Sequence, residues 1–456
     1  MKFPVSSLFL LGWLVAGCGG GGGVGGGSSV FHAADTGWAK TFGTTQNDEI
    51  AQVVLQTADG RLVFGGGGQQ AFVDSLHIPL LVCMDASGAV IWQKIYGGSV
   101  RRGAVLGMIE TADGGFFATG YSTWNNWVLS PDDAWVMKTD RDGELMWKKG
   151  YDGGGLDRTN AIRLTIDEGC VVGGSITTPS VASFGYFVMK LMTDGTVSWA
   201  NRYGVGDNSD MGTDLQVTSD GGYIVSGWTS SDGSSYSARV LKLNAVGAVE
   251  WNRVFPGPVN ASTWWRKLVI QCAPDGGYIL AGTTNLLSST QDAWVLKLDG
   301  VGNVIWQNAY GSEGDDTAEG ISVVSDGGCI VTGQRDGRLW LFKLNRDGAI
   351  LWEKVYGDGN AAGKSVIVLT SGDCLVGGCT DSVDSSFWGG DAWILQAGDD
   401  GSLDALDQTV SSAVTPTGVV SVEMSATVVG LVLMVTDDTL TVASDAELSV
   451  FSQESY

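Results

Sequence analysis

Residues 318–356 read AEGISVVSDGGCIVTGQRDGRLWLFKLNRDGAILWEKVY and contain one complete structural unit. Three apolar runs occupy 318–324, 329–332 and 340–344, and a fourth begins at Ala349. Asp326-Gly327 separates the first two runs, and a turn ending at Gly348 separates the last two. Asp and Gly tolerate the positive φ that tight hairpin turns require. The stretch therefore predicts four short antiparallel strands.

The unit recurs along most of the chain. Its tryptophan returns at Trp38, Trp92, Trp147, Trp199, Trp251, Trp306 and Trp352. Four residues after each stands another aromatic: Phe42, Tyr96, Tyr151, Tyr203, Phe255, Tyr310 and Tyr356. Residues i and i+4 of a strand share a face, so each pair predicts an aromatic stripe between neighbouring sheets. Four-stranded units repeated in this way are typical of a β-propeller.

The two ends of the repeat region predict how the ring closes. The last unit has three strands, up to Asp400-Gly401, but Ala405 stands where its fourth-strand tryptophan should be. The segment from Trp38 to Gly43 is a fourth strand with no unit ahead of it. We therefore expect an all-β, seven-bladed propeller of four-stranded antiparallel blades over residues 34–406, closed by the N-terminal strand.

A lysine recurs in the third strand of five units: Lys138, Lys190, Lys242, Lys297 and Lys343. Cys83 and Gln396 replace it in the first and last units. Because function rarely needs one residue in every repeat, we expect a solvated or inter-blade charge.

The motif Asp292-Ala293-Trp294, Lys297-Leu298, Gly302, Trp306 and Tyr310-Gly311 resembles bacterial β-propeller repeat lipoproteins, an uncharacterised exported family. The resemblance covers about residues 38–401 and implies architecture and little chemistry. The spacing of Gly302 and Trp306 is also weakly similar to that of pyrroloquinoline-quinone propellers, but the adjacent Cys pair often seen beside that quinone is absent.

The N-terminus has the pattern of a lipoprotein signal peptide over residues 1–17. Lys2 precedes an apolar run, and Ala16-Gly17 precedes Cys18, as in the lipobox at which bacterial prolipoproteins are cut and acylated. A Gly-rich tether, residues 18–33, follows. We expect an exported protein that is held in the cell envelope by a lipid on Cys18. The outer membrane is favoured, because Gly19 is not the Asp that signals retention in the inner membrane, and the tether is compatible with surface display. The alternative is secretion with an unmodified Cys18.

The formal net charge of −24, with no basic run, argues against a nucleic-acid partner. His32 and His77 are the two histidines of the chain, which disfavours His-based catalysis and metal sites. Six cysteines follow Cys18; most lie in apolar strand patterns, so buried free thiols are favoured over disulfides.

Connectivity places the Asp-Gly turns and the third-to-fourth turns on one face of a propeller, the short-turn face. The longer connections, after the second and fourth strands, lie on the opposite long-loop face, where function usually resides. That face carries tryptophans outside the repeat: Trp124, Trp127, Trp264, Trp265 and Trp388. Exposed Trp is enriched in binding hot spots, but these loops could also bury their own Trp.

Acidic residues precede the first strands on the same face: Asp48, Asp157, Asp210, Asp315 and Asp316. Carboxylates converging on a central channel could hold Ca²⁺, which takes six to eight oxygens. The alternative is that Asp occurs there because it favours turns.

Three functions remain open. The first, which we favour, is a lipid-anchored binding scaffold that recognises a protein or glycan through the long-loop face, with no enzymatic turnover. The second is an extracytoplasmic carbohydrate-active enzyme, and the third is a structural subunit of an envelope assembly complex. The tail, residues 407–456, alternates small polar and apolar residues and is expected to be β-rich or partly disordered.

Overall fold

A computed structural model describes the chain from Gly37 onward, in segments. These are residues 37–43, 49–69, 77–96, 102–123, 133–152, 155–178, 181–204, 208–232, 235–260, 267–285, 290–357, 359–380, 390–403, and the tail strands given below. The chain divides into two compact units at Asp35 and Thr36, and all described residues belong to the second. Their regular secondary structure consists of β-strands alone. No helix long and apolar enough to cross a membrane occurs among them.

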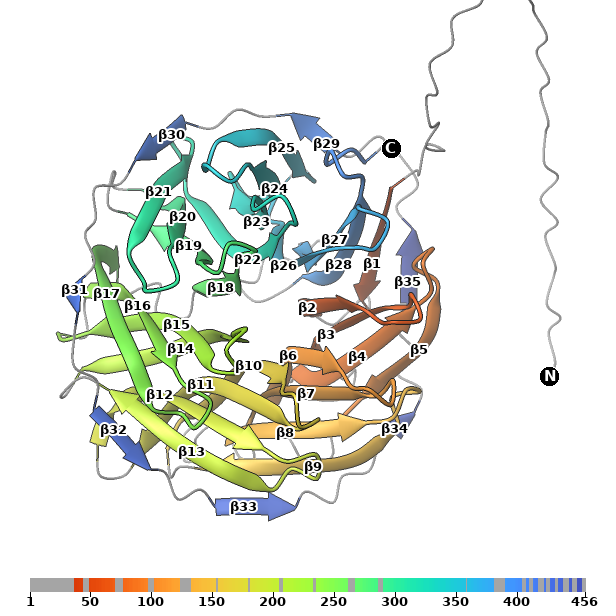
Figure 1. Ribbon diagram of the computed structural model, residues 1–456. Helices are drawn as coiled ribbons and strands as arrows, with labels where there is room; N and C mark the ends of the chain where they lie inside the picture. Colours follow the sequence, from red (N-terminus) through yellow and green to blue (C-terminus); the bar gives the residue numbers. More distant parts are fainter. Residues whose placement is uncertain are drawn as a thin grey trace, which may run out of the picture. The chain divides into compact units, whose positions relative to one another are not determined.

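Each of the seven repeats forms one antiparallel blade, and the blades are arranged in a ring (Figure 1). Blades 1 to 3 comprise β2 (Ile50–Gln56), β3 (Leu62–Gln69), β4 (His77–Met84) and β5 (Val90–Ile95); β6 (Arg102–Glu110), β7 (Phe116–Thr123), β8 (Asp133–Thr139) and β9 (Leu145–Asp152); and β10 (Asp157–Leu164), β11 (Cys170–Thr178), β12 (Val181–Leu191) and β13 (Val197–Gly204).

Blades 4 to 6 follow the same plan. They comprise β14 (Ser209–Val217), β15 (Tyr223–Ser230), β16 (Ser235–Leu243) and β17 (Val249–Asn260); β18 (Val269–Cys272), β19 (Tyr278–Thr284), β20 (Asp292–Leu298) and β21 (Val304–Gly311); and β22 (Asp316–Val323), β23 (Cys329–Arg335), β24 (Arg338–Leu344) and β25 (Ile350–Tyr356).

Blade 7 joins the two ends of the repeat region. Its first three strands are β26 (Ala362–Val368), β27 (Cys374–Thr380) and β28 (Asp391–Ala397), and its fourth is the N-terminal β1 (Trp38–Gly43). Trp38 pairs with Gln396 and Phe42 with Ala392. The expected fold, including closure by the N-terminal strand, is confirmed.

The C-terminal tail adds a fifth, outermost strand to every blade. These strands are β29 (Asp407–Thr409), β30 (Ala413–Pro416), β31 (Val422–Glu423), β32 (Thr427–Gly430), β33 (Met434–Asp437), β34 (Ala443–Ser444) and β35 (Ser449–Ser452). They pair antiparallel with the fourth strands of blades 6, 5, 4, 3, 2, 1 and 7, in that order. The tail therefore runs around the rim against the order of the blades (Figure 1); we call it the strap.

The strap is in register with the repeat. In four of its seven pairings a valine stands opposite the second aromatic of the blade: Val414 opposite Tyr310, Val428 opposite Tyr203, Val435 opposite Tyr151 and Val450 opposite Phe42. Its last strand, β35, pairs with β1, so β1 lies between β28 and β35.

The core consists of seven apolar clusters, each between two neighbouring blades. At every junction the repeated tryptophan covers the glycine of the third-to-fourth turn of the next blade. A Cβ atom on any of these glycines would lie 2.7 to 3.0 Å from the tryptophan ring, and their φ angles are positive. The glycine that stands four residues ahead of each repeated tryptophan from Trp92 to Trp352 is therefore covered by the tryptophan of the preceding blade, not by the one that follows it in the sequence.

The second aromatic of each repeat ties the same two blades together where it is tyrosine. The hydroxyls of Tyr96, Tyr151, Tyr203, Tyr310 and Tyr356 donate to the carbonyls of those turn glycines at 2.6 to 2.8 Å. Phe42 and Phe255 lack this hydrogen bond, so the junctions of blades 7 and 1 and of blades 4 and 5 depend on packing alone at this point.

In four of the five units the recurrent lysine is neither solvated nor in an ion pair between blades, which corrects our expectation for these four; Lys343 of blade 6 is half-buried. Lys138, Lys190, Lys242 and Lys297 are buried, and each pairs with the Asp of the first turn of its own blade at 2.6 to 2.8 Å. The lysine stem packs inside the sheet while the ammonium reaches the turn. In blade 7 Gln396 donates to Asp373 instead, at 3.0 Å.

The six described cysteines are free thiols. Cys83, Cys170, Cys329 and Cys374 are buried in the blades, as expected, whereas Cys272 is exposed. Burial raises the pKa of the Cys170 thiol to about 12, so this thiol is unreactive at neutral pH.

Candidate functional site

Seven of the residues singled out from the sequence lie outside the described residues: Cys18, Asp48, Trp124, Trp127, Trp264, Trp265 and Trp388. Lipidation and recognition by these tryptophans remain predictions.

The other acidic residues lie at the start of the first strands, as their sequence positions indicate. Asp157, Asp210 and Asp316 take equivalent places in blades 3, 4 and 6, and all three are fully buried. Each has its own partner. The carboxylate of Asp157 accepts from the backbone N–H of Thr177 at 3.2 Å, and Asp210 forms a fully buried ion pair with Arg239 at 3.1 Å.

Asp315 and Asp316 lie side by side and organise one turn. Asp315 accepts from the backbone N–H of Gln291 at 2.9 Å, and Asp316 accepts from the Ser312 hydroxyl at 2.9 Å and from the Ser312 N–H. Burial raises the pKa of Asp316. Among the residues that the structure describes, no group of three His, Cys, Asp or Glu side chains could hold a metal ion.

A β-bulge recurs in the first strand and shapes the ring centre. In blades 1, 2, 3, 4, 6 and 7 the pairing of first and second strands slips by one residue at the same point, which leaves one residue unpaired. The unpaired residues are Gln52, Leu106, Asn160, Thr213, Glu319 and Lys364; we call them the bulge residues. Bulges re-aim side chains and are common beside functional sites.

A glycine of the second strand makes room for each bulge. A Cβ atom on Gly66, Gly120, Gly174, Gly227, Gly333 or Gly378 would overlap a backbone carbonyl of the first strand. The recurrent second-strand glycine is thus the sequence signal for a feature that sequence analysis did not predict.

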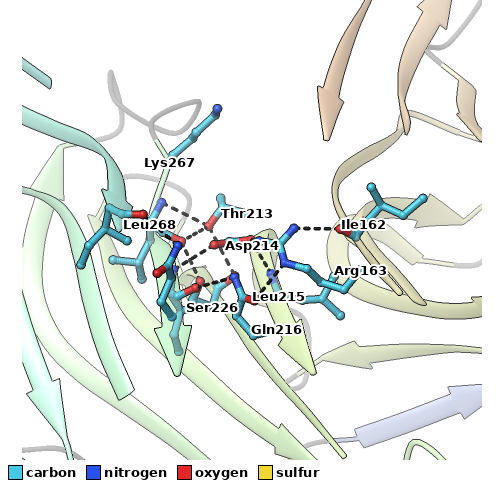
Figure 2. Close-up of polar contacts among 12 residues, drawn as sticks. Ile162, Arg163, Thr213, Asp214, Leu215, Gln216, Ser226, Lys267 and Leu268 are labelled. Carbon is cyan, nitrogen blue, oxygen red and sulfur yellow. Dashed lines mark hydrogen bonds and ion pairs between the residues drawn. The ribbon is translucent and has the colours of Figure 1, made fainter. Parts of the chain in front are cut away.

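Side chains of the first strands form a polar network across blades 3, 4 and 5 at the ring centre (Figure 2). Arg163 pairs with Asp214 at 3.0 Å and donates to the Gln216 side-chain oxygen at 2.9 Å. The other Asp214 oxygen accepts from the backbone N–H of Ile270 at 3.0 Å, and Gln216 donates to the Ile270 carbonyl at 3.0 Å. Burial raises the pKa of Asp214, and the Arg163 guanidinium opposes that shift. Removing either partner would leave an uncompensated charge.

Lys267 crosses the ring centre. It lies two residues ahead of β18 in blade 5, and its Nζ donates to the carbonyl of Gln52, the bulge residue of blade 1, at 3.2 Å. Blades 6 and 7 separate these two blades in the ring, so the contact cannot be one between neighbours. Figure 2 shows the side chain directed away from the network around Asp214.

The charge of Lys267 is only partly compensated. Burial and the neighbouring Lys364 lower the pKa of its ammonium, Glu319 and Asp214 oppose the shift, and the resulting pKa is about 8. Glu319 is itself engaged by Lys364, whose Nζ lies 2.7 Å from both carboxylate oxygens. A partly buried amine with a shifted pKa that reaches across a ring of blades is a candidate for a functional group.

The repeat pattern did not point to Lys267, because this residue departs from what the repeats share. Eight residues before the first-turn Asp, or its counterpart Ser371 in blade 7, the other blades carry Ala51, Val105, Thr159, Gly212, Ala318 and Gly363. A long, positively charged side chain at a position where the other blades carry small residues is the sequence signal that distinguishes Lys267.

No protein-family model matches the chain, and no curated protein matches it. Several solved structures are similar. A protein of unknown function from Dyadobacter fermentans shares 9% identity over 79% of this chain and 97% of that chain, with a TM-score of 0.49. A protein from Lactobacillus plantarum shares 11% identity over 81% of this chain and 100% of that chain, with a TM-score of 0.40. A xylan β-1,4-xylosidase from Bacillus halodurans shares 9% identity over 87% of this chain and 92% of that chain, with a TM-score of 0.33. At these values the likenesses carry no argument about function, so the identification of a seven-bladed propeller rests on the strand pairing.

Proposed function

We propose that the protein is a lipid-anchored binding scaffold of the cell envelope and that it recognises a protein or glycan partner on the long-loop face, at the ring centre. The single observation that carries the proposal is that charged side chains found in one blade only lie at the ring centre. Lys267 follows a fourth-to-first connection, which belongs to the long-loop face, and reaches across the ring.

The charged residues of the short-turn face repeat from blade to blade, whereas those at the ring centre do not. On the short-turn face, four blades repeat the same Lys–Asp pair, which is what a structural role requires. At the ring centre, Lys267, Arg163 and Asp214 occur once each, which is what recognition of a particular ligand requires. The non-repeat tryptophans Trp264 and Trp265 stand three and two residues ahead of Lys267 in the sequence and would enlarge the contact.

The test is a glycan array and a pull-down from envelope extract with residues 36–456, the second compact unit. The test variant replaces Trp124, Trp127, Trp264 and Trp265 with Ala. A matched control replaces Ile166 and Val246, two exposed apolar residues of short turns, with Ala. We expect the tryptophan variant to lose the bound ligand and the control to keep it. Equal binding by both variants would contradict recognition on the long-loop face.

Attachment through Cys18 has its own test. Cys18→Ser in the full chain is expected to abolish incorporation of labelled palmitate and to move the protein from the membrane to the soluble fraction, because acyl chains on this residue would be the anchor. A Cys18→Ser protein that remains in the membrane fraction would contradict the lipid anchor.

A further inference from the structure

We propose that Lys267 is the anchor of a binding site for a carboxylate at the ring centre. This inference rests on the proposed function, since it names the chemical class that the long-loop face recognises.

The first step is the pairing of the charges around the ring centre. Arg163 is neutralised by Asp214 at 3.0 Å, and Lys364 by Glu319 at 2.7 Å. Lys267 has a backbone carbonyl as its hydrogen-bond acceptor, and no carboxylate of the described residues forms an ion pair with it. An ammonium has three donors, so two remain for a ligand.

The second step is the cost of this arrangement. Charged groups withdrawn from water are normally paired, because an unpaired one loses its hydration without compensation. In a chain with a net charge of −24, a carboxylate partner for Lys267 would be easily supplied. No such carboxylate forms an ion pair with Lys267 among the described residues, and the proposed ligand supplies it.

The third step selects the anion. The ring-centre cluster contains three cations, Arg163, Lys267 and Lys364, and two anions, Asp214 and Glu319, so its formal charge is 3 − 2 = +1. A carboxylate, with one negative charge, brings this cluster to neutrality. A phosphate monoester carries about −1.5 to −2 at neutral pH and would meet Asp214 and Glu319 with excess negative charge.

A purely structural role for Lys267, as a strut between blades 5 and 1, predicts something different. A strut needs only the hydrogen bond to Gln52, and its loss would change stability without affecting any ligand. A ligand anchor needs the positive charge, and binding would follow the protonation of the amine.

The experiment is a calorimetric titration of the full chain with sodium glucuronate; glucose is the neutral control and inorganic phosphate the control for charge. The variants are Lys267→Met, which removes the charge, Lys267→Arg, which keeps it at all accessible pH, and Lys297→Met, which removes a buried lysine of a short-turn ion pair. Circular dichroism verifies that each variant is folded.

We expect wild type to bind glucuronate in the millimolar range, with glucose and phosphate much weaker. Lys267→Met should weaken glucuronate binding about tenfold or more, and Lys297→Met should leave it unchanged. Between about pH 7 and about pH 9.5 the affinity of wild type should fall as Lys267 loses its proton, whereas that of Lys267→Arg should stay flat. The charged groups that act on Lys267 are Glu319 of β22, Lys364 of β26 and Asp214 of β14.

Equal affinity of Lys267→Met and wild type would overturn the proposal, as would phosphate binding as tight as that of glucuronate. If wild type fails to bind glucuronate at ~50 mM while the tryptophan-dependent ligand is found on the array, the carboxylate site is wrong and the scaffold function stands. If both experiments give no ligand, both proposals fail.

Discussion

At the scale of single residues, Lys267 carries a cost in the folded protein. Its ammonium is partly buried, and its folded pKa of about 8 lies below the ordinary 10.5. The unfolded chain therefore binds the proton more tightly, so the charge destabilises the fold below pH 8 and this penalty disappears as the pH rises from about 8 to about 10.5.

We therefore expect Lys267→Met to raise the free energy of unfolding at pH 7 by about 1–3 kcal/mol, although it removes a hydrogen bond. Urea denaturation at pH 7 and near pH 10.5 measures this, and the gain should shrink at the higher pH. A variant less stable than wild type at pH 7 would indicate a strut rather than a functional charge.

Where a blade lacks a residue of the repeat, a neighbouring side chain can take over its contacts. Blade 1 carries Cys83 in place of the recurrent lysine, and there the Arg61 guanidinium contacts both Asp59, at 3.0 Å, and the Cys83 sulfur, at 3.8 Å. The hydrogen bonds from Thr57 and Arg61 lower the pKa of Asp59 to about 2. The repeats reveal the substitution but not its compensation, because Arg61 lies in the first turn, directly ahead of β3, and not in the third strand that carries the lysine in other blades.

At the scale of the elements, the contact between tryptophan and turn glycine holds each blade to the next. Gly302 has a φ of +85°, and a Cβ atom there would lie 3.0 Å from the Trp251 ring. Gly276, in the same blade, has a φ of +82° with nothing within 4 Å of a Cβ atom. A substitution of Gly276 would therefore test the backbone conformation alone, whereas a substitution of Gly302 would also disturb the contact between blades.

We expect Gly276→Ala to lower the free energy of unfolding by about 1 kcal/mol, the cost of the left-handed backbone. Gly302→Ala should cost about 2–3 kcal/mol, because it also displaces the tryptophan. Thermal denaturation of both variants measures the difference. Equal effects would show that the glycine is required for its φ angle alone.

The sequence predicted the elements that repeat. The spacing of Trp306 and Tyr310 fixes a strand face, and the unmatched segment from Trp38 to Gly43 fixes the closure of the ring, because both follow from short-range alternation and counting. The strap could not be predicted in the same way. Its strands are two to four residues long, and their partners lie in blades up to hundreds of residues away, so local pattern carries little information about the pairing.

At the scale of the whole molecule, the strap covers the outer edge of every blade. Uncovered strand edges are templates for pairing with other chains. Each strap strand adds a few backbone hydrogen bonds, and each of these is worth about 1 kcal/mol net.

Truncation after Leu403 should therefore leave a ring with seven open edges. We expect a loss of about 3 kcal/mol or more in unfolding free energy and the appearance of oligomers in light scattering. Truncation after Ser444 removes β35 alone and should give an intermediate loss, located at blade 7. A monomer of unchanged stability after the longer truncation would contradict the role of the strap.

The pairing of β35 with β1 also has a consequence for the order in which the strands can pair during synthesis. β1 precedes every other described strand along the chain, and its two partners, β28 and β35, come from the far end of the described residues. During synthesis from the N-terminus the ring closes when β1 pairs with β28, and the outer edge of β1 stays open until β35 has been made. A chain that lacks β35 keeps its blades but leaves the outer edge of β1 uncovered, and a quality-control protease that recognises free strand edges would detect that defect in an otherwise folded molecule.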